Sequence, residues 1–245
     1  MEGQVKSLII LNFHHVTDSD ASEGLLSVQK QVFEQHLQII RESTVPVISL
    51  AKLCEENLES KFAIALTIDD GSASDYEIVR PLLQQEQLPA TFFPIVDQVG
   101  QNGKMNWAQI KQLHANGFEI GSHGLSHDIL TRMSPEKQHE ELSTSRKKME
   151  EQLGASCESF AFPYGRFDND LLEKAAAAGY KRVYTTGLKI NTVCNKDLLY
   201  YRWNITNKTQ PDLLGQVLNS RGQLSPALEV HTRLKDIAKR MLGGN

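Results

Sequence analysis

The sequence predicts an α/β fold in which parallel strands form a closed or nearly closed barrel with helices outside it. Short apolar runs alternate with amphipathic segments along the whole 245-residue chain, which is typical of repeated βα units. Seven or eight such runs fit into this length, and that number favours a barrel over an open sheet. The G-x-G-x-x-G fingerprint of open dinucleotide-binding sheets is absent. We therefore expect one domain over residues 1–245, with its core at about 7–206 and C-terminal helices at about 211–242.

Each expected element follows from its local pattern. Short apolar runs predict strands at residues 7–16, 45–50, 62–71, 90–96, 118–124, 159–165, 181–187 and 199–205. Helical spacing of apolar residues and capping signals predict helices at 28–42, 51–58, 74–87, 106–116, 134–153 and 168–178, and two more that begin near Pro211 and Pro226. In the helix at 134–153, Ser134 and Pro135 are typical of a helix start, and Gly154 is typical of a helix end.

Composition excludes several classes of protein. Hydrophobic residues make up 40% of the chain and charged residues 23%, so the chain can bury a sizeable core. Its net charge of -4 argues against nucleic acid as a partner. The three cysteines, Cys54, Cys157 and Cys194, are far apart and predict neither a disulfide framework nor a cysteine zinc site. Because no membrane span or signal peptide is seen, we expect a cytoplasmic protein; the oligomeric state is left open.

Unusual polar residues lie at the carboxyl ends of four of the expected strands. In order, they are His14 and His15, Asp69 and Asp70, His123 and His127, and Pro163 and Tyr164. The carboxyl ends of the strands in a barrel lie on one face, where the active site is built. Polar residues at four strand ends are harder to explain by a role in the stability of the fold than polar residues at one strand end. The sequence therefore predicts a shared site on this face.

Asp70, His123 and His127 form a candidate set of metal ligands. The two histidines are four residues apart, a spacing that places both imidazoles on one side of a helical turn. Neighbouring side chains on extended backbone point opposite ways, so one acid of Asp69-Asp70 can bind metal while the other faces a substrate. Taken alone, an acidic pair before glycine is more often a turn, and a lone histidine is more often structural. Together the three residues suit zinc or a similar divalent ion with open positions for water.

Three segments resemble the first three motifs of the polysaccharide deacetylase family (NodB-homology, carbohydrate esterase 4). They are TIDDG at 67–71, SHGLSH at 122–127 and FAFPYG at 160–165, and PATFF at 89–93 also fits. The resemblance spans roughly residues 7–206. It implies a distorted (β/α)7 barrel, related to the TIM barrel. It also implies a metal-dependent hydrolase that removes N-acetyl groups from an amino-sugar-containing substrate, with zinc as the expected metal and cobalt or nickel as alternatives.

The resemblance also implies a role for each matching residue. Asp69 would be the general base, and Asp70, with the two histidines, would bind the metal. Tyr164 would lend its backbone N–H to the oxyanion. LNFHHV at 11–16 resembles the Tyr-His element of a subgroup with a permuted motif order, typified by poly-N-acetylglucosamine deacetylases. By that match His14 would be the general acid, with His15 as the second choice.

The chain departs from the family pattern in three places. The third motif usually begins with an arginine that pairs with the base, and here that position is Ala161. Arg202, in the last expected strand, is the first candidate to replace this arginine, and Arg166 is the weaker one. The Asp-Trp of the fourth motif and the Leu-x-His of the fifth are not found.

These departures keep two alternatives open. One is a carbohydrate-binding or regulatory protein on the same scaffold with weakened catalysis, and the other is a deacetylase of a non-sugar amide. For a sugar deacetylase and for a carbohydrate-binding protein alike, the expected partner is an N-acetylated sugar or glycan. Trp107 is a candidate to line a sugar cleft, although core packing is the more frequent role of such a side chain.

Overall fold

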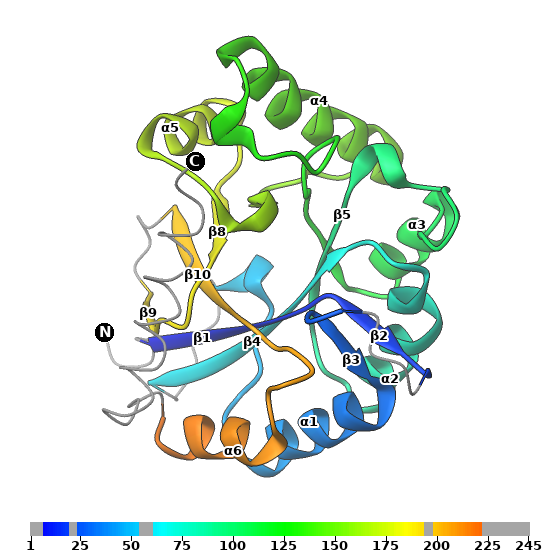
Figure 1. Cartoon of the computed structure of the whole chain (residues 1–245), viewed down its shortest axis with the longest axis vertical. Helices are drawn as coiled ribbons and strands as arrows, with labels where there is room; N and C mark the ends of the chain where they lie inside the picture. Colours follow the sequence, from blue (N-terminus) through cyan, green and yellow to red (C-terminus); the bar gives the residue numbers. More distant parts are fainter. Residues whose placement is uncertain (1–6, 20–23, 54–60, 194–197, 222–245) are drawn as a thin grey trace.

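The computed structural model describes residues 7–19, 24–53, 61–193 and 198–221. In this part of the chain seven parallel strands form one curved sheet in the order β6-β5-β4-β1-β10-β8-β7 (Figure 1). Their bounds are β1 Ser7–Phe13, β4 Phe62–Asp70, β5 Thr91–Pro94, β6 Glu119–Ile120, β7 Ser159–Ala161, β8 Arg182–Thr186 and β10 Leu199–Asn204. The first and last strands in sequence are therefore neighbours in the sheet, because β1 pairs with β10.

The two outer strands of this order meet and nearly close the barrel. A parallel bridge joins Ser122, just after β6, to Phe160 in β7. The Ser122 N–H donates to the Ser159 carbonyl at 2.9 Å, and the Ala161 N–H donates to the Ser122 carbonyl at 2.9 Å. The barrel is distorted where β9 (Asn191–Thr192) pairs antiparallel with the start of β1. The expected barrel architecture is confirmed.

Helices surround the strands (Figure 1). They are α1 Lys30–Glu42, α2 Arg80–Gln85, α3 Trp107–Ala115, α4 Pro135–Leu153, α5 Asn169–Ala177 and α6 Pro211–Asn219. Short 3-10 helices cover Leu50–Lys52, Val96–Gln98, Leu130–Arg132 and Pro163–Gly165, a π-helix covers Asp75–Val79, and β2 (His15–Thr17) pairs with β3 (Ser27–Gln29). None of the helices in the described ranges has the length and apolarity needed to cross a bilayer.

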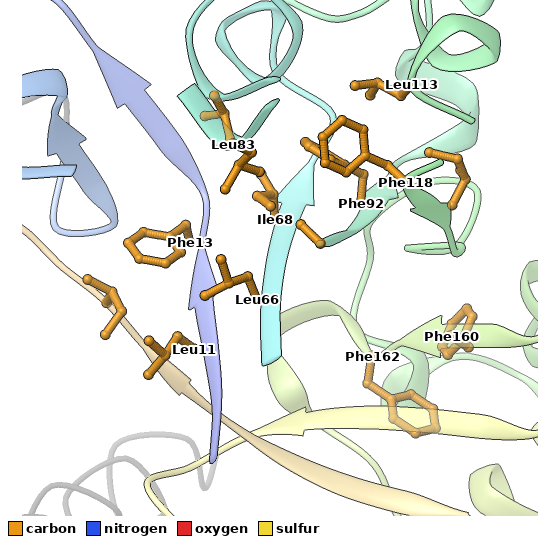
Figure 2. Packing of buried hydrophobic residues seen from close by; sticks show 14 of the residues in the cluster. Leu11, Phe13, Leu66, Ile68, Leu83, Phe92, Leu113, Phe118, Phe160 and Phe162 are labelled. Atoms are coloured by element: carbon orange, nitrogen blue, oxygen red, sulfur yellow. The ribbon is translucent and has the colours of Figure 1, made fainter. Parts of the chain in front are cut away.

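Alternate residues of each strand serve two cores. Leu11, Phe13, Leu66 and Ile68 point outward and pack against the helices (Figure 2). The residues between them line the inside of the barrel, because successive side chains point to opposite faces. The inward residues of β1 and β4 are apolar at first, namely Leu8, Ile10, Ala63 and Ala65. Toward the carboxyl ends they become polar: Asn12, Thr67 and Asp69 are all buried. The strands thus carry buried polar groups to one end of the barrel.

Several expected elements differ in the structure, among them the strand expected at 159–165, which is β7 followed by the 3-10 helix Pro163–Gly165. The strand expected at 45–50 is wrong, since only Val47 bridges to β4, at Ile64; from Thr67 onward β5 occupies that edge of β4. The helix expected at 74–87 begins as the π-helix. The strand expected at 118–124 is only β6, and the chain beyond it is a loop. The helix from Pro226 and most of that at 51–58 lie outside the described residues.

Candidate active site

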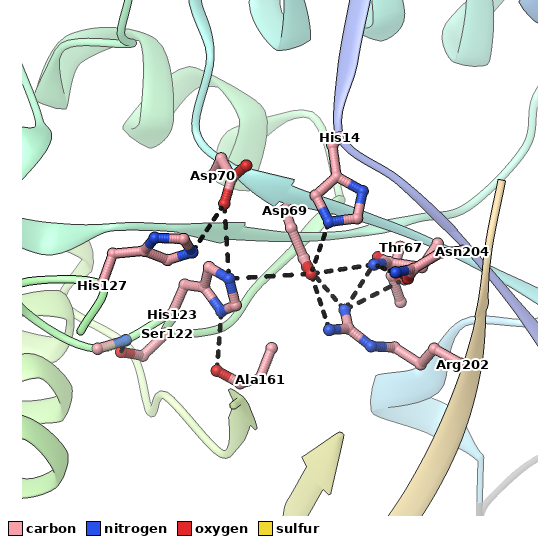
Figure 3. Close-up of polar contacts among 12 residues, drawn as sticks. His14, Thr67, Asp69, Asp70, Ser122, His123, His127, Ala161, Arg202 and Asn204 are labelled. Carbon is pink, nitrogen blue, oxygen red and sulfur yellow. Dashed lines mark hydrogen bonds and ion pairs between the residues drawn. The ribbon is translucent and has the colours of Figure 1, made fainter. Parts of the chain in front are cut away.

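Asp69 is held at the end of β4 by three hydrogen bonds (Figure 3). Its side chain is buried, and Arg202 donates to both carboxylate oxygens, Nη1 to Oδ1 at 2.6 Å and Nη2 to Oδ2 at 2.7 Å. Asn12 Nδ2 donates to Oδ2 at 3.0 Å. Burial by itself raises the pKa of Asp69, but the charge and hydrogen bonds of Arg202 hold that pKa well below its usual range. Asp69 is therefore ionised at neutral pH.

Arg202 is fully buried inside the barrel. Nη1 also donates to Asn12 Oδ1 at 3.0 Å, and the guanidinium carbon lies 5.3 Å from the Phe93 ring centroid and 5.8 Å from that of Tyr184. The structure thus brings the expected arginine from β10 to Asp69. Arg166, the weaker candidate, forms no ion pair with Asp69 within the described ranges.

Asp70, His123 and His127 come together beside Asp69 (Figure 3). Asp70 Oδ1 lies 3.5 Å from His123 Nε2 and 3.4 Å from His127 Nε2, and one ligand atom of each residue lies within 4.8 Å of the others. The two acids diverge at the end of β4 because Asp70 has a φ of 75°. The left-handed backbone continues at Gly71, where a Cβ would lie only 2.8 Å from the Pro94 Cβ. This turn presents Asp70 to the histidines.

The protonation of His123 suits a metal ligand. Its Nδ1 lies 2.8 Å from the Ala161 carbonyl, and a carbonyl can only accept, so Nδ1 carries the proton. Nε2 is then left with its lone pair facing Asp70. Burial lowers the pKa of His123 and keeps the ring neutral. Asp70 Oδ1 is a buried acceptor without a hydrogen-bond donor in the described part of the chain. Two imidazole nitrogens and an unpartnered carboxylate oxygen fit zinc.

The expected reason for this convergence was wrong. The chain from Gly121 to Ile129 is not helical, so His123 and His127 do not share a helical turn. They meet because the loop turns back at His127, which has a φ of 72°. The His127 ring lies 4.9 Å from the His123 ring and 4.8 Å from the Tyr164 ring. Tyr164 is also left-handed, with a φ of 59°, and the residue is 58% exposed.

His14 faces Asp69 from the opposite side to the histidine pair (Figure 3). Its Nε2 lies 3.9 Å from Asp69 Oδ2. Burial lowers the pKa of His14, and the charge of Asp69 offsets part of that decrease. His15 belongs to β2, and its Nδ1 lies 3.2 Å from Ser74 Oγ. Of the two candidate histidines, His14 is therefore the one beside Asp69.

The sequence analysis missed the polar residues that support this site. Asn12 bridges Asp69, Arg202 and Asn204, and Thr67 donates to Asn12 Oδ1 at 2.7 Å. A polar residue within the apolar run of β1 was the available signal.

Trp107 does not lie with the candidate residues. It lines a cavity of about 260 Å³ with Val96 and three polar residues of α4, Lys148, Glu151 and Gln152. None of these residues belongs to the cluster around Asp69, so the structure gives no support to Trp107 as part of a cleft at this site.

Comparison with known proteins shows which family the chain belongs to. The family model for polysaccharide deacetylases matches residues 57–183, just over half of the chain. The protein belongs to the polysaccharide deacetylase family. YxkH of Bacillus subtilis, a protein named for this family, is 26% identical over an alignment of 183 residues that covers 73% of this chain and 64% of that protein. A poly-β-1,6-N-acetyl-D-glucosamine N-deacetylase of Staphylococcus aureus is 24% identical over 225 residues, covering 80% of this chain and 77% of that one.

Solved structures of deacetylases share the barrel. PplD of Streptococcus pyogenes, a deacetylase solved in complex with acetate, superposes with a TM-score of 0.78 and 26% identity, covering 86% of this chain and 98% of that one. IcaB of Ammonifex degensii superposes with a TM-score of 0.74 and 24% identity, covering 89% and 98%. The fold is therefore that of the polysaccharide deacetylases, with a nearly closed parallel barrel.

Proposed function

We propose that this protein is a metal-dependent hydrolase that removes N-acetyl groups from an amino-sugar-containing substrate. The observation that carries the proposal is the position of Asp69 Oδ2, which lies 3.9 Å from His14 Nε2 on one side and 3.9 Å from His123 Nε2 on the other. An ionised carboxylate thus lies between a candidate metal site and a second histidine. Hydrolysis of an amide by activated water needs such a pair of proton-transferring groups.

The residues are assigned roles as follows. Asp70, His123 and His127 would hold a divalent ion, with zinc the best match to these donors and cobalt or nickel as alternatives. When bound, the ion supplies Lewis-acid polarisation of the acetyl carbonyl and lowers the pKa of a water. Asp69 accepts a proton from the attacking water, and Arg202 keeps it ionised and oriented for that step. The backbone N–H of Tyr164 is assigned to the developing oxyanion by family resemblance.

His14 is assigned to protonate the departing amine. The C–N bond breaks only when the nitrogen gains a proton, because an amine anion is too poor a leaving group. Since burial lowers the pKa of His14, the ring is neutral before the reaction and must first acquire a proton. Asp69 Oδ2 and His14 Nε2 are 3.9 Å apart, beyond direct hydrogen-bond reach, so the proton taken from water would pass to His14 through one water and then to the amine. Water is consumed, and acetate and the free amine are released.

Acetate release from N-acetylglucosamine oligomers by the zinc-loaded protein tests this function. A chelator should abolish release, and added zinc should restore it. Asp69→Asn should retain zinc and lose turnover, whereas undiminished turnover would eliminate Asp69 as the base. The matched control is Asp97→Asn, because Asp97 is an exposed carboxylate that pairs with Lys148 outside the site.

The same experiment separates the alternatives. Binding of the oligomers without acetate release would indicate a carbohydrate-binding or regulatory protein on the deacetylase scaffold. Acetate release from simple N-acetylated amines, but not from the oligomers, would indicate a deacetylase of non-sugar amides.

A further inference from the structure

The two histidines of the candidate metal site lie in a loop whose halves are held differently. His123, in the first half, has its own anchors: its N–H donates to the Pro94 carbonyl at 3.1 Å, and its Nδ1 donates to the Ala161 carbonyl at 2.8 Å. His127, in the second half, has a left-handed backbone and a less buried ring. The position of His127 therefore depends on what holds the residues just before it.

Glu141 of α4 is one of the groups that hold those residues; the Val96 and Asp97 N–H groups also donate to the Gly124 and Leu125 carbonyls at 3.1 Å. The Glu141 side chain is buried, and its Oε2 accepts the Leu125 N–H at 2.7 Å. The next N–H, that of Ser126, lies 3.2 Å from Oε1 and 3.3 Å from Oε2. Hydrogen bonds to a carboxylate are roughly twice as strong as those between neutral groups. A buried carboxylate thus binds the two N–H groups that immediately precede His127.

The surrounding residues are arranged for this contact. Gly124 has a φ of +81°, and a Cβ there would lie 2.9 Å from Glu141 Oε2, so a larger residue would push the carboxylate away. Gln138 lies three residues before Glu141 on the same helix face. Its Nε2 donates to the Leu130 carbonyl at 3.0 Å. Helix α4 is therefore hydrogen-bonded to the loop on both sides of His127.

We propose that Glu141 is a positioning residue that holds His127 where it can bind the metal. The inference rests on the proposed function, because it takes Asp70, His123 and His127 as the ligands. Glu141 acts through the Leu125 and Ser126 N–H groups and makes no contact with the ligand atoms themselves. Partners of this kind, one step removed from the metal, typically change metal affinity by about 10–100-fold when removed.

Zinc affinity of the full chain, measured by competition with a chromogenic chelator, tests this role. Glu141→Ala should weaken zinc binding by about 10–100-fold. Glu141→Gln should weaken it less, because the amide keeps one acceptor oxygen, and this variant carries the test if Glu141→Ala does not fold. Ser145→Ala is the matched control: Ser145 Oγ is buried in α4, donates to Leu142 O at 3.2 Å and lies 3.1 Å from the Tyr180 hydroxyl, so its loss disturbs the surroundings of α4 without removing a hydrogen bond to the Leu125 or Ser126 N–H. It should leave zinc affinity unchanged.

Two further measurements separate positioning from general destabilisation. In metal-free protein, the Leu125 and Ser126 amides should exchange with solvent faster in Glu141→Ala but not in Ser145→Ala. The double variant Glu141→Ala/His127→Ala should bind zinc as His127→Ala does, because Glu141 acts through His127. Equal zinc affinity of Glu141→Ala and the unmodified protein would overturn the role of Glu141 alone. Absence of zinc binding by the unmodified protein would overturn the proposed function as well.

Discussion

Replacing Arg202 by methionine should show how strongly the buried ion pair holds Asp69 ionised. The two Nη atoms of Arg202 lie 2.6 and 2.7 Å from the carboxylate oxygens, and both side chains are buried. Removing one partner of such a pair costs about 3–5 kcal/mol, because the remaining charge is left in a low-dielectric interior. Since one pKa unit corresponds to about 1.4 kcal/mol, the pKa of Asp69 should rise by about 2–4 units.

This change has a defined pH dependence. In the unmodified protein the folded-state pKa of Asp69 lies below its ordinary value of 3.8. The pair therefore stabilises the fold above that pH, and the stabilisation is lost as the pH falls through the folded-state pKa. In Arg202→Met the free energy of unfolding at neutral pH should fall by about 3–5 kcal/mol, and the difference should shrink in acid. The acid limb of kcat/KM should move up by about 2 units or more.

Urea unfolding in neutral and acidic buffer, together with the pH profile of acetate release, measures both effects. Arg182→Met is the control, because Arg182 pairs with Glu119 at 3.2 Å and Glu158 at 3.5 Å near the amino ends of the strands. It should cost stability without moving the acid limb. An Arg202→Met protein that loses less than about 1 kcal/mol and keeps the acid limb in place would refute the reasoning.

Three further predictions concern other buried groups. His14→Ala should lower turnover by about 100-fold or more with zinc affinity unchanged, whereas His15→Ala should remain active, and the reverse pattern would exchange their roles. Burial lowers the pKa of His36 from 6.5, so its neutral form stabilises the fold above that pH and the stabilisation is lost as the pH falls. The Tm of the unmodified protein and of the exposed control His139→Gln should therefore fall more on acidification than that of His36→Gln; parallel curves would contradict this. Burial, reinforced by the charge of Asp70, raises the pKa of Asp75 well above 3.8, and neither carboxyl oxygen has a hydrogen-bond partner in the described ranges. A raised folded-state pKa lowers the stability of the protein as the pH rises from 3.8 through that pKa. Asp75→Asn should therefore stabilise the metal-free protein most at neutral pH. A Tm difference between the two proteins that stays constant from acid to neutral pH would argue against this.

The sequence was sufficient for the barrel because its strands are nearly continuous apolar runs. FAIAL before Asp69 and SLIILNF before His14 read as buried strands, and parallel strands place their carboxyl ends on one face. This rule is enough to bring Asp69, Asp70 and His123 to one end of the barrel, whereas His127 joins them because the loop turns back. The strand expected at 45–50 failed because pairing depends on which edge of β4 is free, and local pattern does not contain that information.

The geometry within the site was harder to predict from the sequence. Left-handed backbone at Asp70, His127 and Tyr164 cannot be predicted from residue types that rarely adopt it. The loop before His127 is hydrogen-bonded to Glu141, which lies in a helix that follows the loop in sequence. Arg202 could be proposed only because the arginine usual in the family is replaced by Ala161. Its partner Asn12 was not singled out because it lies within an apolar run.

The pairing of β1 with β10 affects when the buried contacts of Asp69 can form as the chain folds. Arg202 lies 133 residues after Asp69 and 190 residues after Asn12, so the contacts that neutralise the interior join distant parts of the chain. While a nascent chain still lacks β10, the inward carboxylate of Asp69 has no cation beside it and burying it is costly. Because β10 both joins β1 to β8 and supplies Arg202, the sheet becomes continuous and Asp69 gains its cation in the same late step.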